Sequence, residues 1–158
     1  WERVPYWLDG FIPLAYLLED EDMIARAKKY IDAILAAQKP DGWICPCADE
    51  DRATYDTWAI QLITKVLTVY YSCSNDERVP DVIYRTLKNY YELLKSEKIK
   101  LFQWGHFRWF ELFLSLNFIY KTHKENQQDK TRQNPDAKIF DSSTTCQEVV
   151  LQSMPSMY

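Results

Sequence analysis

Three short segments of the chain combine aromatic residues with charged or hydrogen-bonding side chains. They are Trp1-Glu2-Arg3 with Tyr6, Trp7 and Asp9, then Tyr55-Asp56-Thr57-Trp58, and then Trp104-Gly105-His106-Phe107-Arg108-Trp109 with Glu111. Aromatic ring faces stack on the C–H surfaces of sugars, while carboxylate, imidazole and guanidinium groups hydrogen-bond their hydroxyls. The segments therefore predict a carbohydrate-binding cavity. Its expected substrate-binding residues are His106, Trp7, Asp9, Asp56, Trp58, Arg108, Trp109 and Glu111.

Each of these residues also has a structural interpretation. A Trp in a buried helix usually belongs to the core, and Asp9 is close enough to a proline kink to bond to the backbone there. Asp56 stands where a helix cap is expected. Arg108 and Glu111 have the i, i+3 spacing of an intrahelical ion pair. His106 has the position of a residue that hydrogen-bonds a neighbouring helix end.

The pattern of apolar residues predicts five helices, over about residues 5–18, 20–38, 53–73, 80–96 and 106–120. The first, third and fifth are expected to be buried, whereas the second and fourth have one apolar face. Trp7, Trp58 and Trp109 follow one another at intervals of 51 residues, each early in a buried helix. This indicates a repeated helical hairpin. We expect an all-α fold, made of hairpins of an incomplete (α/α)6 toroid; a solenoid of stacked hairpins is the alternative.

Composition divides the chain into two parts. Residues 1–120 hold 22 of the 24 aromatic residues and the whole net charge of −4. We therefore expect a helical domain over residues 1–124, followed over 125–158 by a polar tail that is disordered or foreign to it. A negative net charge argues against nucleic acid as a partner. No stretch is long and apolar enough to suggest a membrane span. The compartment is not indicated.

The cysteines do not form a recognisable metal motif. Cys45-Pro46-Cys47 lacks the second ligand pair that structural zinc sites show, so two free thiols in a loop are the preferred interpretation and no metal ligand is assigned. The sequence also contains no Gly-rich phosphate loop, nucleophile elbow or HExxH motif.

Two blocks of the chain resemble glycoside hydrolase family 127, the β-L-arabinofuranosidase-like family. The first is Trp1-Glu-Arg-Val-Pro-Tyr-Trp-Leu-Asp-Gly-Phe-Ile-Pro-Leu-Ala-Tyr-Leu-Leu18 with Ile34-Leu-Ala-Ala-Gln38 and Asp41-Gly-Trp43; the second is Gly105-His106 with Arg108-Trp109 and Glu111. The resemblance covers about residues 1–122. It implies an (α/α)6 barrel and a glycoside hydrolase that acts on β-L-arabinofuranosides at a non-reducing end, or on related plant-type sugars.

The resemblance also implies a cysteine nucleophile beside a zinc ion that is held by a glutamate and cysteines. No Glu-x-Cys or adjacent Cys-Cys motif is present, so neither nucleophile nor zinc ligand is assigned and no cofactor is expected in this chain. Six hairpins of 51 residues would require on the order of 300 residues, and the chain begins with Trp1. We therefore expect a fragment that is inactive alone, lines the substrate cavity, and has carbohydrate and the rest of a parent domain as partners.

Two other functions fit the same residues. One is a helical protein-interaction module without catalysis, because an open toroid leaves two apolar edges uncovered and favours oligomers or aggregation. The other is a different α/α-toroid sugar enzyme, such as an unsaturated uronyl hydrolase.

Overall fold

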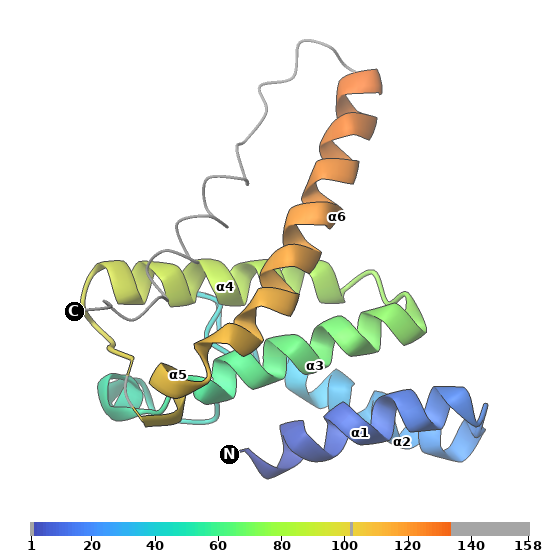
Figure 1. The fold of residues 1–158 in the computed structure, drawn as a ribbon, viewed down its shortest axis with the longest axis horizontal. Helices are drawn as coiled ribbons and strands as arrows, with labels where there is room; N and C mark the ends of the chain where they lie inside the picture. The colour runs from blue at the N-terminus through green and yellow to red at the C-terminus, as the bar shows by residue number, and fades with distance from the viewer. Residues whose placement is uncertain (1, 102, 134–158) are drawn as a thin grey trace.

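The computed structural model describes residues 2–101 and 103–133, with side chains up to Thr122. Every regular element in these residues is helical, which confirms the prediction of an all-α fold (Figure 1). The α-helices are α1 (Arg3–Leu17), α2 (Glu21–Ala36), α3 (Trp58–Ser74), α4 (Val79–Lys95), α5 (Gln103–Phe107) and α6 (Leu112–Gln133). Two 3₁₀ helices, η1 (Asp49–Thr54) and η2 (Trp109–Glu111), precede α3 and α6.

Local side-chain chemistry sets several helix ends. The carboxylate of Asp20 accepts the backbone N–H of Met23 at 2.9 Å and caps the start of α2. Asn75, at φ 54°, adopts the left-handed conformation that ends α3. Pro80 stands in the first turn of α4, where a missing N–H costs nothing. These three boundaries lie where the sequence predicts them.

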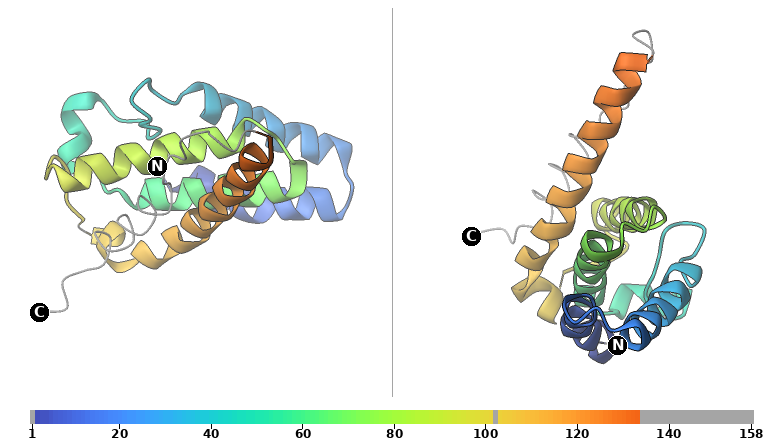
Figure 2. Two further views of the ribbon diagram at one scale, coloured as in Figure 1. Left: turned by 90° about the horizontal axis from the view of Figure 1, so that it is seen from above. Right: turned by 90° about the vertical axis from the view of Figure 1, so that its right-hand side faces the viewer.

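Helix α3 forms the centre of the bundle. Ten of its residues are buried, including Leu62, Val66 and Leu67. Helices α1 and α6 pack on either side of α3, while α4 covers α3 and α2 covers α1 from the outer side (Figure 2). Since α1 and α3 run in one direction and α2 and α4 in the other, each consecutive pair forms an antiparallel hairpin (Figure 1).

The flanking helices differ from the prediction that they are buried as completely as α3. Helix α1 buries one stripe, Pro5, Leu8, Ile12 and Ala15, and exposes large apolar side chains on its other faces. The start of α6 also exposes apolar side chains. The reason is geometric: only α3 has helices on both sides and a third above it. The closed toroid stays a prediction.

The predicted fifth helix is divided. It consists of α5, then η2, then α6, and α6 continues past the expected end near Tyr120 to Gln133. Its last turns extend beyond the rest of the bundle (Figures 1 and 2). The predicted boundary at residues 124 and 125 therefore lies within a continuous helix. Residues 134–158 of the predicted tail are outside the described part of the chain.

The connection between α2 and α3 is held by Trp43. Its side chain is fully buried, and its indole N–H donates to the carbonyl oxygen of Cys45 at 2.9 Å. The guanidinium of Arg52 lies over the Trp43 ring, 4.7 Å from its centroid, and pairs with Asp41. This packing fixes the chain just before Asp56. None of the described helices has the length and hydropathy needed to cross a bilayer.

Candidate functional site

Asp56 joins the starts of α3 and α5. One carboxylate oxygen, Oδ1, accepts the backbone N–H groups of Trp58 at 3.0 Å and Gly105 at 2.9 Å, and Oδ2 accepts the N–H of Trp104 at 3.1 Å. Asp56 is 7% exposed. Unpaired N–H groups at a helix start favour a negative charge, so the carboxylate is stabilised by three donors. Asp56 therefore caps the starts of two helices, α3 and α5, whereas the sequence suggests a cap for one.

A buried polar network lies directly behind this junction. Gln61 donates from Nε2 to the hydroxyl of Tyr90 at 3.1 Å and to the carbonyl oxygen of Gly105 at 3.1 Å. The Tyr90 hydroxyl is also 3.2 Å from the hydroxyl of Thr57. Burial raises the pKa of Tyr90 to about 12, so the phenol stays protonated. The network fixes the position of α5 against α3 and α4.

Five side chains meet on the outer side of this junction, and we call them the aromatic–guanidinium cluster: Tyr6, Trp58, Trp104, Arg108 and Glu111. The guanidinium of Arg108 lies over the Trp58 ring, 5.0 Å from its centroid. It donates from Nη1 to the hydroxyl of Tyr6 at 2.8 Å, and it forms an ion pair with Glu111, with Nε 2.9 Å from Oε1. The rings of Tyr6 and Trp104 lie 5.3 and 5.9 Å from the Trp58 ring.

The members of the cluster differ in their access to solvent. The ring of Trp104 is 52% exposed and that of Tyr6 is 42% exposed, while Trp58 beneath them is buried. Glu111 is nearly buried, and its Oε2 accepts no hydrogen bond from the described part of the chain. The arrangement offers two accessible aromatic rings around a fixed cation. These groups can stack on an apolar ligand face and hydrogen-bond a polar edge.

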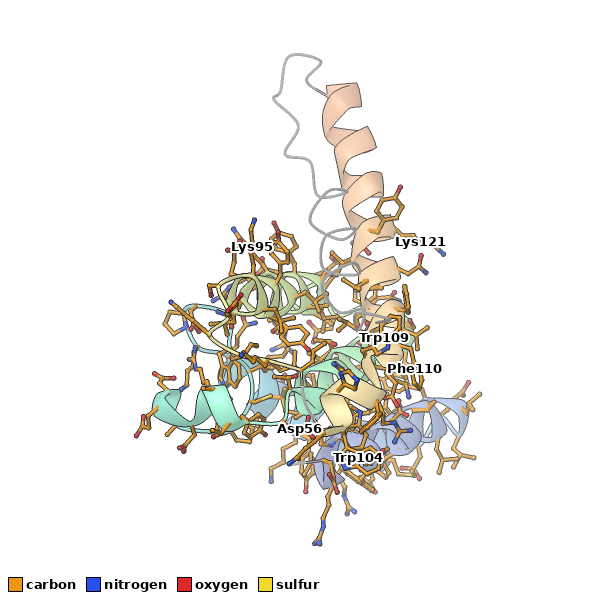
Figure 3. All side chains as sticks on the ribbon, turned by 60° about the vertical axis from the view of Figure 1, so that its left-hand side comes forward. Asp56, Lys95, Trp104, Trp109, Phe110 and Lys121 are labelled. Carbon is orange, nitrogen blue, oxygen red and sulfur yellow. The ribbon has the colours of Figure 1, made fainter. Side chains whose placement is uncertain are left out.

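Figure 3 shows how the labelled residues follow the chain. Asp56 and Trp104 lie at the end of the bundle where α5 begins, Trp109 and Phe110 lie on the turn into α6, and Lys121 lies further along that helix. The starts of α3 and α5 thus meet at one end of the bundle, and α1 contributes Tyr6.

Five of the predicted site residues lie outside the cluster, and one of them, Asp56, forms the junction behind it. Trp7 stacks on Phe11, with ring centroids 4.3 Å apart, and contacts Tyr30 of α2. Asp9 pairs with the amino group of Lys65 at 2.8 Å, which links α1 to α3. His106 meets the Phe107 ring edge to face, at 5.3 Å between centroids. Trp109 packs against Phe113.

Two residues of the cluster are absent from the set predicted from sequence. Tyr6 and Trp104 belong to the aromatic segments, but nothing in their residue type distinguishes them from their neighbours Trp7 and Phe107. Consecutive helical residues point about 100° apart, so the register of each helix decides which aromatic ring joins Trp58. A helical wheel of α1 with Leu8 facing inward would have separated Tyr6 from Trp7.

The cysteines of the α2–α3 connection do not fit the zinc site that the resemblance implies. Cys45 is buried, and burial raises the pKa of its thiol far above the ordinary value; the pKa of the Cys47 thiol is raised for the same reason. A zinc ligand needs a thiolate, which this environment disfavours. Within residues 2–101 and 103–133, no three His, Cys, Asp or Glu side chains are grouped to hold a metal ion.

A cavity of about 650 Å³ lies between η1 and the end of α4, apart from the cluster. Its walls include Asp41, Arg52, Glu92 and Lys98. The guanidinium of Arg52 is already paired with two carboxylates, which are those of Asp41 and Asp49. None of the residues predicted to bind substrate lines this cavity.

Comparisons with known proteins identify no relative. No protein-family model matches the chain, and neither the curated proteins nor the solved structures contain a match. Function is therefore inferred from the geometry of the site and from the resemblance of the two sequence blocks.

Proposed function

We propose that this chain forms a carbohydrate-binding wall in an α/α-toroid glycoside hydrolase of the β-L-arabinofuranosidase-like kind. The observation that carries the proposal is the aromatic–guanidinium cluster at the end of the bundle where α3 and α5 begin. Trp104 and Tyr6 are exposed beside a cation that Glu111 and Trp58 hold in place. Aromatic faces with a few fixed polar groups are typical of sugar sites.

The guanidinium of Arg108 is preorganised to hydrogen-bond sugar hydroxyls. Contacts with Trp58, Tyr6 and Glu111 restrict its rotamers, so little conformational entropy is lost when a ligand binds. Nη2 is the nitrogen that neither Tyr6 nor Glu111 occupies. We expect this edge of the guanidinium to donate to a hydroxyl pair of a sugar stacked on Trp104.

Asp56 has a positioning role in this proposal. Its two oxygens are occupied by the N–H groups of Trp58, Gly105 and Trp104. It therefore sets the distance between Trp58 and Trp104 and leaves direct sugar contact to the exposed rings. Since the sequence lacks the cysteine motifs that the resembled family uses, we expect this chain to bind sugar without hydrolysing it.

Ligand-observed NMR with methyl β-L-arabinofuranoside tests the proposal on the whole chain. We expect saturation transfer to the sugar, and at least about fivefold weaker binding for Trp104→Ala, since stacked aromatic rings contribute about 1 kcal/mol or more. Tyr6→Ala should weaken binding as well. Tyr30→Ala is the matched control, because Tyr30 is 41% exposed, like Tyr6, but lies on α2.

Two results would contradict the proposal. One is the absence of transfer to any member of a sugar panel that also holds arabinopyranosides and a uronate disaccharide. The other is transfer that Tyr30→Ala removes and Tyr6→Ala leaves unchanged. Transfer to the uronate disaccharide alone would favour the uronyl hydrolase alternative. Circular dichroism of each variant shows whether the helical fold is kept.

A protein-interaction module is the second candidate function. It is favoured by the large apolar side chains that α1, α5 and η2 expose, among them Leu14, Leu17, Phe107 and Phe110. Sugar binding at Trp104 would support the first function, whereas a chain that binds no sugar and associates through these faces would support the second.

A further inference from the structure

Helix α1 carries an apolar stripe on the side that faces away from α3. The stripe consists of Val4, Trp7, Phe11, Leu14 and Leu18, at the 3-4-3-4 spacing of a helix–helix seam. Asp9 and Tyr16 mark the opposite side of α1, since they contact Lys65 and Tyr70 of α3.

The stripe is exposed towards both ends of the helix, while Phe11 at its middle is partly buried against the core and stacks on Trp7. Val4 is 43% exposed, Leu14 is 48% and Leu18 is 61%, and Trp7 and Tyr30 form an exposed aromatic contact beside them. A continuous apolar stripe of this length on a helix typically marks a contact with another helix.

The charges at the two ends of α1 select an antiparallel partner. Glu19, Asp20, Glu21 and Asp22 form an exposed acidic run at the C-terminal end of the stripe, whereas the N-terminal end has the exposed Arg3 beside the partly buried Glu2. Two parallel copies of α1 would place the two acidic runs together, which is repulsive. Two antiparallel copies would place Arg3 of each copy beside the acidic run of the other.

The stripe is also symmetric about its centre. Phe11 is the middle residue, and Arg3 and Glu19 are each eight positions away from it. A twofold axis at Phe11 therefore pairs Arg3 with Glu19 of the other copy, and Val4 with Leu18. Closed twofold dimers of this self-complementary type are the commonest protein oligomers.

Gly10, next to the centre, allows a close approach. A Cβ added to Gly10 would meet no described atom within 4 Å, so packing within the chain does not require glycine there. Glycine in the middle of a helix is less favourable than alanine, because it loses more backbone entropy on folding. A second helix crossing close to Gly10 would give this residue a function.

We propose that the α1 stripe binds a second copy of this chain, with the two α1 helices antiparallel about a twofold axis at Phe11. Charge complementarity and the symmetry of the stripe favour a second copy of the chain as the partner. The inference does not depend on the proposed sugar site, because Tyr6 contacts Trp58 and Arg108 on a different face of α1.

Sedimentation equilibrium of the full chain tests this dimer against its 18.9 kDa monomer mass. We expect a dimer, and for Leu14→Glu a dissociation constant at least about 30-fold higher, because hot-spot residues contribute 2 kcal/mol or more. Leu18→Glu, close to the helix end, should act in the same way and serves if Leu14→Glu does not fold. The matched control is Leu114→Glu on α6, where the side chain is 54% exposed, and it should leave the dimer intact.

A charge exchange tests the antiparallel arrangement. Arg3→Glu should weaken the dimer, and the double variant Arg3→Glu, Glu19→Arg should restore it. A chain that stays monomeric at several hundred micromolar would overturn the proposal. So would a dimer that survives Leu14→Glu and Leu18→Glu but is lost in Leu114→Glu, since the contact would then lie on α6.

Discussion

The carboxylate of Asp56 accepts the backbone N–H of Gly105 at 2.9 Å, across 49 residues of sequence. The same oxygen accepts the N–H of Trp58, so one atom joins the first turns of α3 and α5. The side chains of Trp58 and Trp104 are brought within contact by this single buried carboxylate.

Replacement of Asp56 is expected to be costly. Asp56→Ala leaves three N–H groups without their acceptor, and the free energy of unfolding should fall by about 3 kcal/mol. Asp56→Asn keeps one acceptor oxygen and should lose less. Urea unfolding followed by circular dichroism measures both values, and a loss below about 0.5 kcal/mol for Asp56→Ala would show that the carboxylate does not join the two helices.

The three glycines should respond differently to alanine. Gly10→Ala should stabilise the folded chain by about 0.5–1 kcal/mol, because the helix interior has open space there. Gly105→Ala should destabilise it by about 1–3 kcal/mol, because the added Cβ would lie 2.9 Å from the Thr57 hydroxyl. Gly42→Ala should cost most, since Gly42 has φ +99° and a Cβ would clash with the Arg85 carbonyl.

Thermal unfolding of the three variants at one low concentration, with the wild type beside them, tests this order. A destabilising Gly10→Ala would contradict the open environment of that residue. A neutral Gly105→Ala would mean that α5 moves away from α3 without cost.

Acid should destabilise the ion pairs around Arg78. The guanidinium hydrogen-bonds Asp76, and this lowers the pKa of that carboxyl below its ordinary value of 3.8; the pKa of Asp32 is lowered by Lys28 and Arg78. As the pH falls below about 4, the unfolded chain binds protons first. The stabilisation, complete at neutral pH, is then lost as the pH passes through the folded-state pKa values.

Unfolding free energies between pH 2.5 and 6 would show this loss. Asp76→Asn should flatten the dependence of stability on pH in that window. Asp81→Asn is the control. The Asp81 carboxylate is 71% exposed, and its ion pair with Arg85 is long, at 4.0 Å, so it contributes little to stability. Equal slopes for the wild type and Asp76→Asn would refute the assigned cause.

The sequence predicts the helical elements well because their signals are local. Asp20, Asn75 and Pro80 act within one turn of the helix ends that they set. The division of the last helix was not predictable in this way. Arg108 adopts φ −113° and ψ 16°, outside helical geometry, and its side chain bonds Tyr6, which is 102 residues away in the sequence.

The regular 51-residue spacing of Trp7, Trp58 and Trp109 does not give the three tryptophans equivalent positions in the fold. Trp58 is the first residue of α3, whereas Trp7 is the fifth residue of α1 and Trp109 begins a 3₁₀ helix. Equal sequence distances therefore give unequal rotations about the helix axes. Only Trp58 reaches the cluster, and Trp7 instead faces Tyr30. Register of this kind depends on tertiary packing, and residue type alone does not fix it.

The central position of α3 determines which parts of the chain unfold locally and which only with the whole domain. Because α1, α4, α5 and α6 all pack on α3, no amide of its buried middle can reach water by the fraying of one neighbour alone. Amide hydrogens of Leu62 to Leu67 should exchange only through global unfolding, whereas those of α1 should exchange through partial opening. Hydrogen–deuterium exchange would then report two classes of protection, with α3 as the last helix to lose its protons.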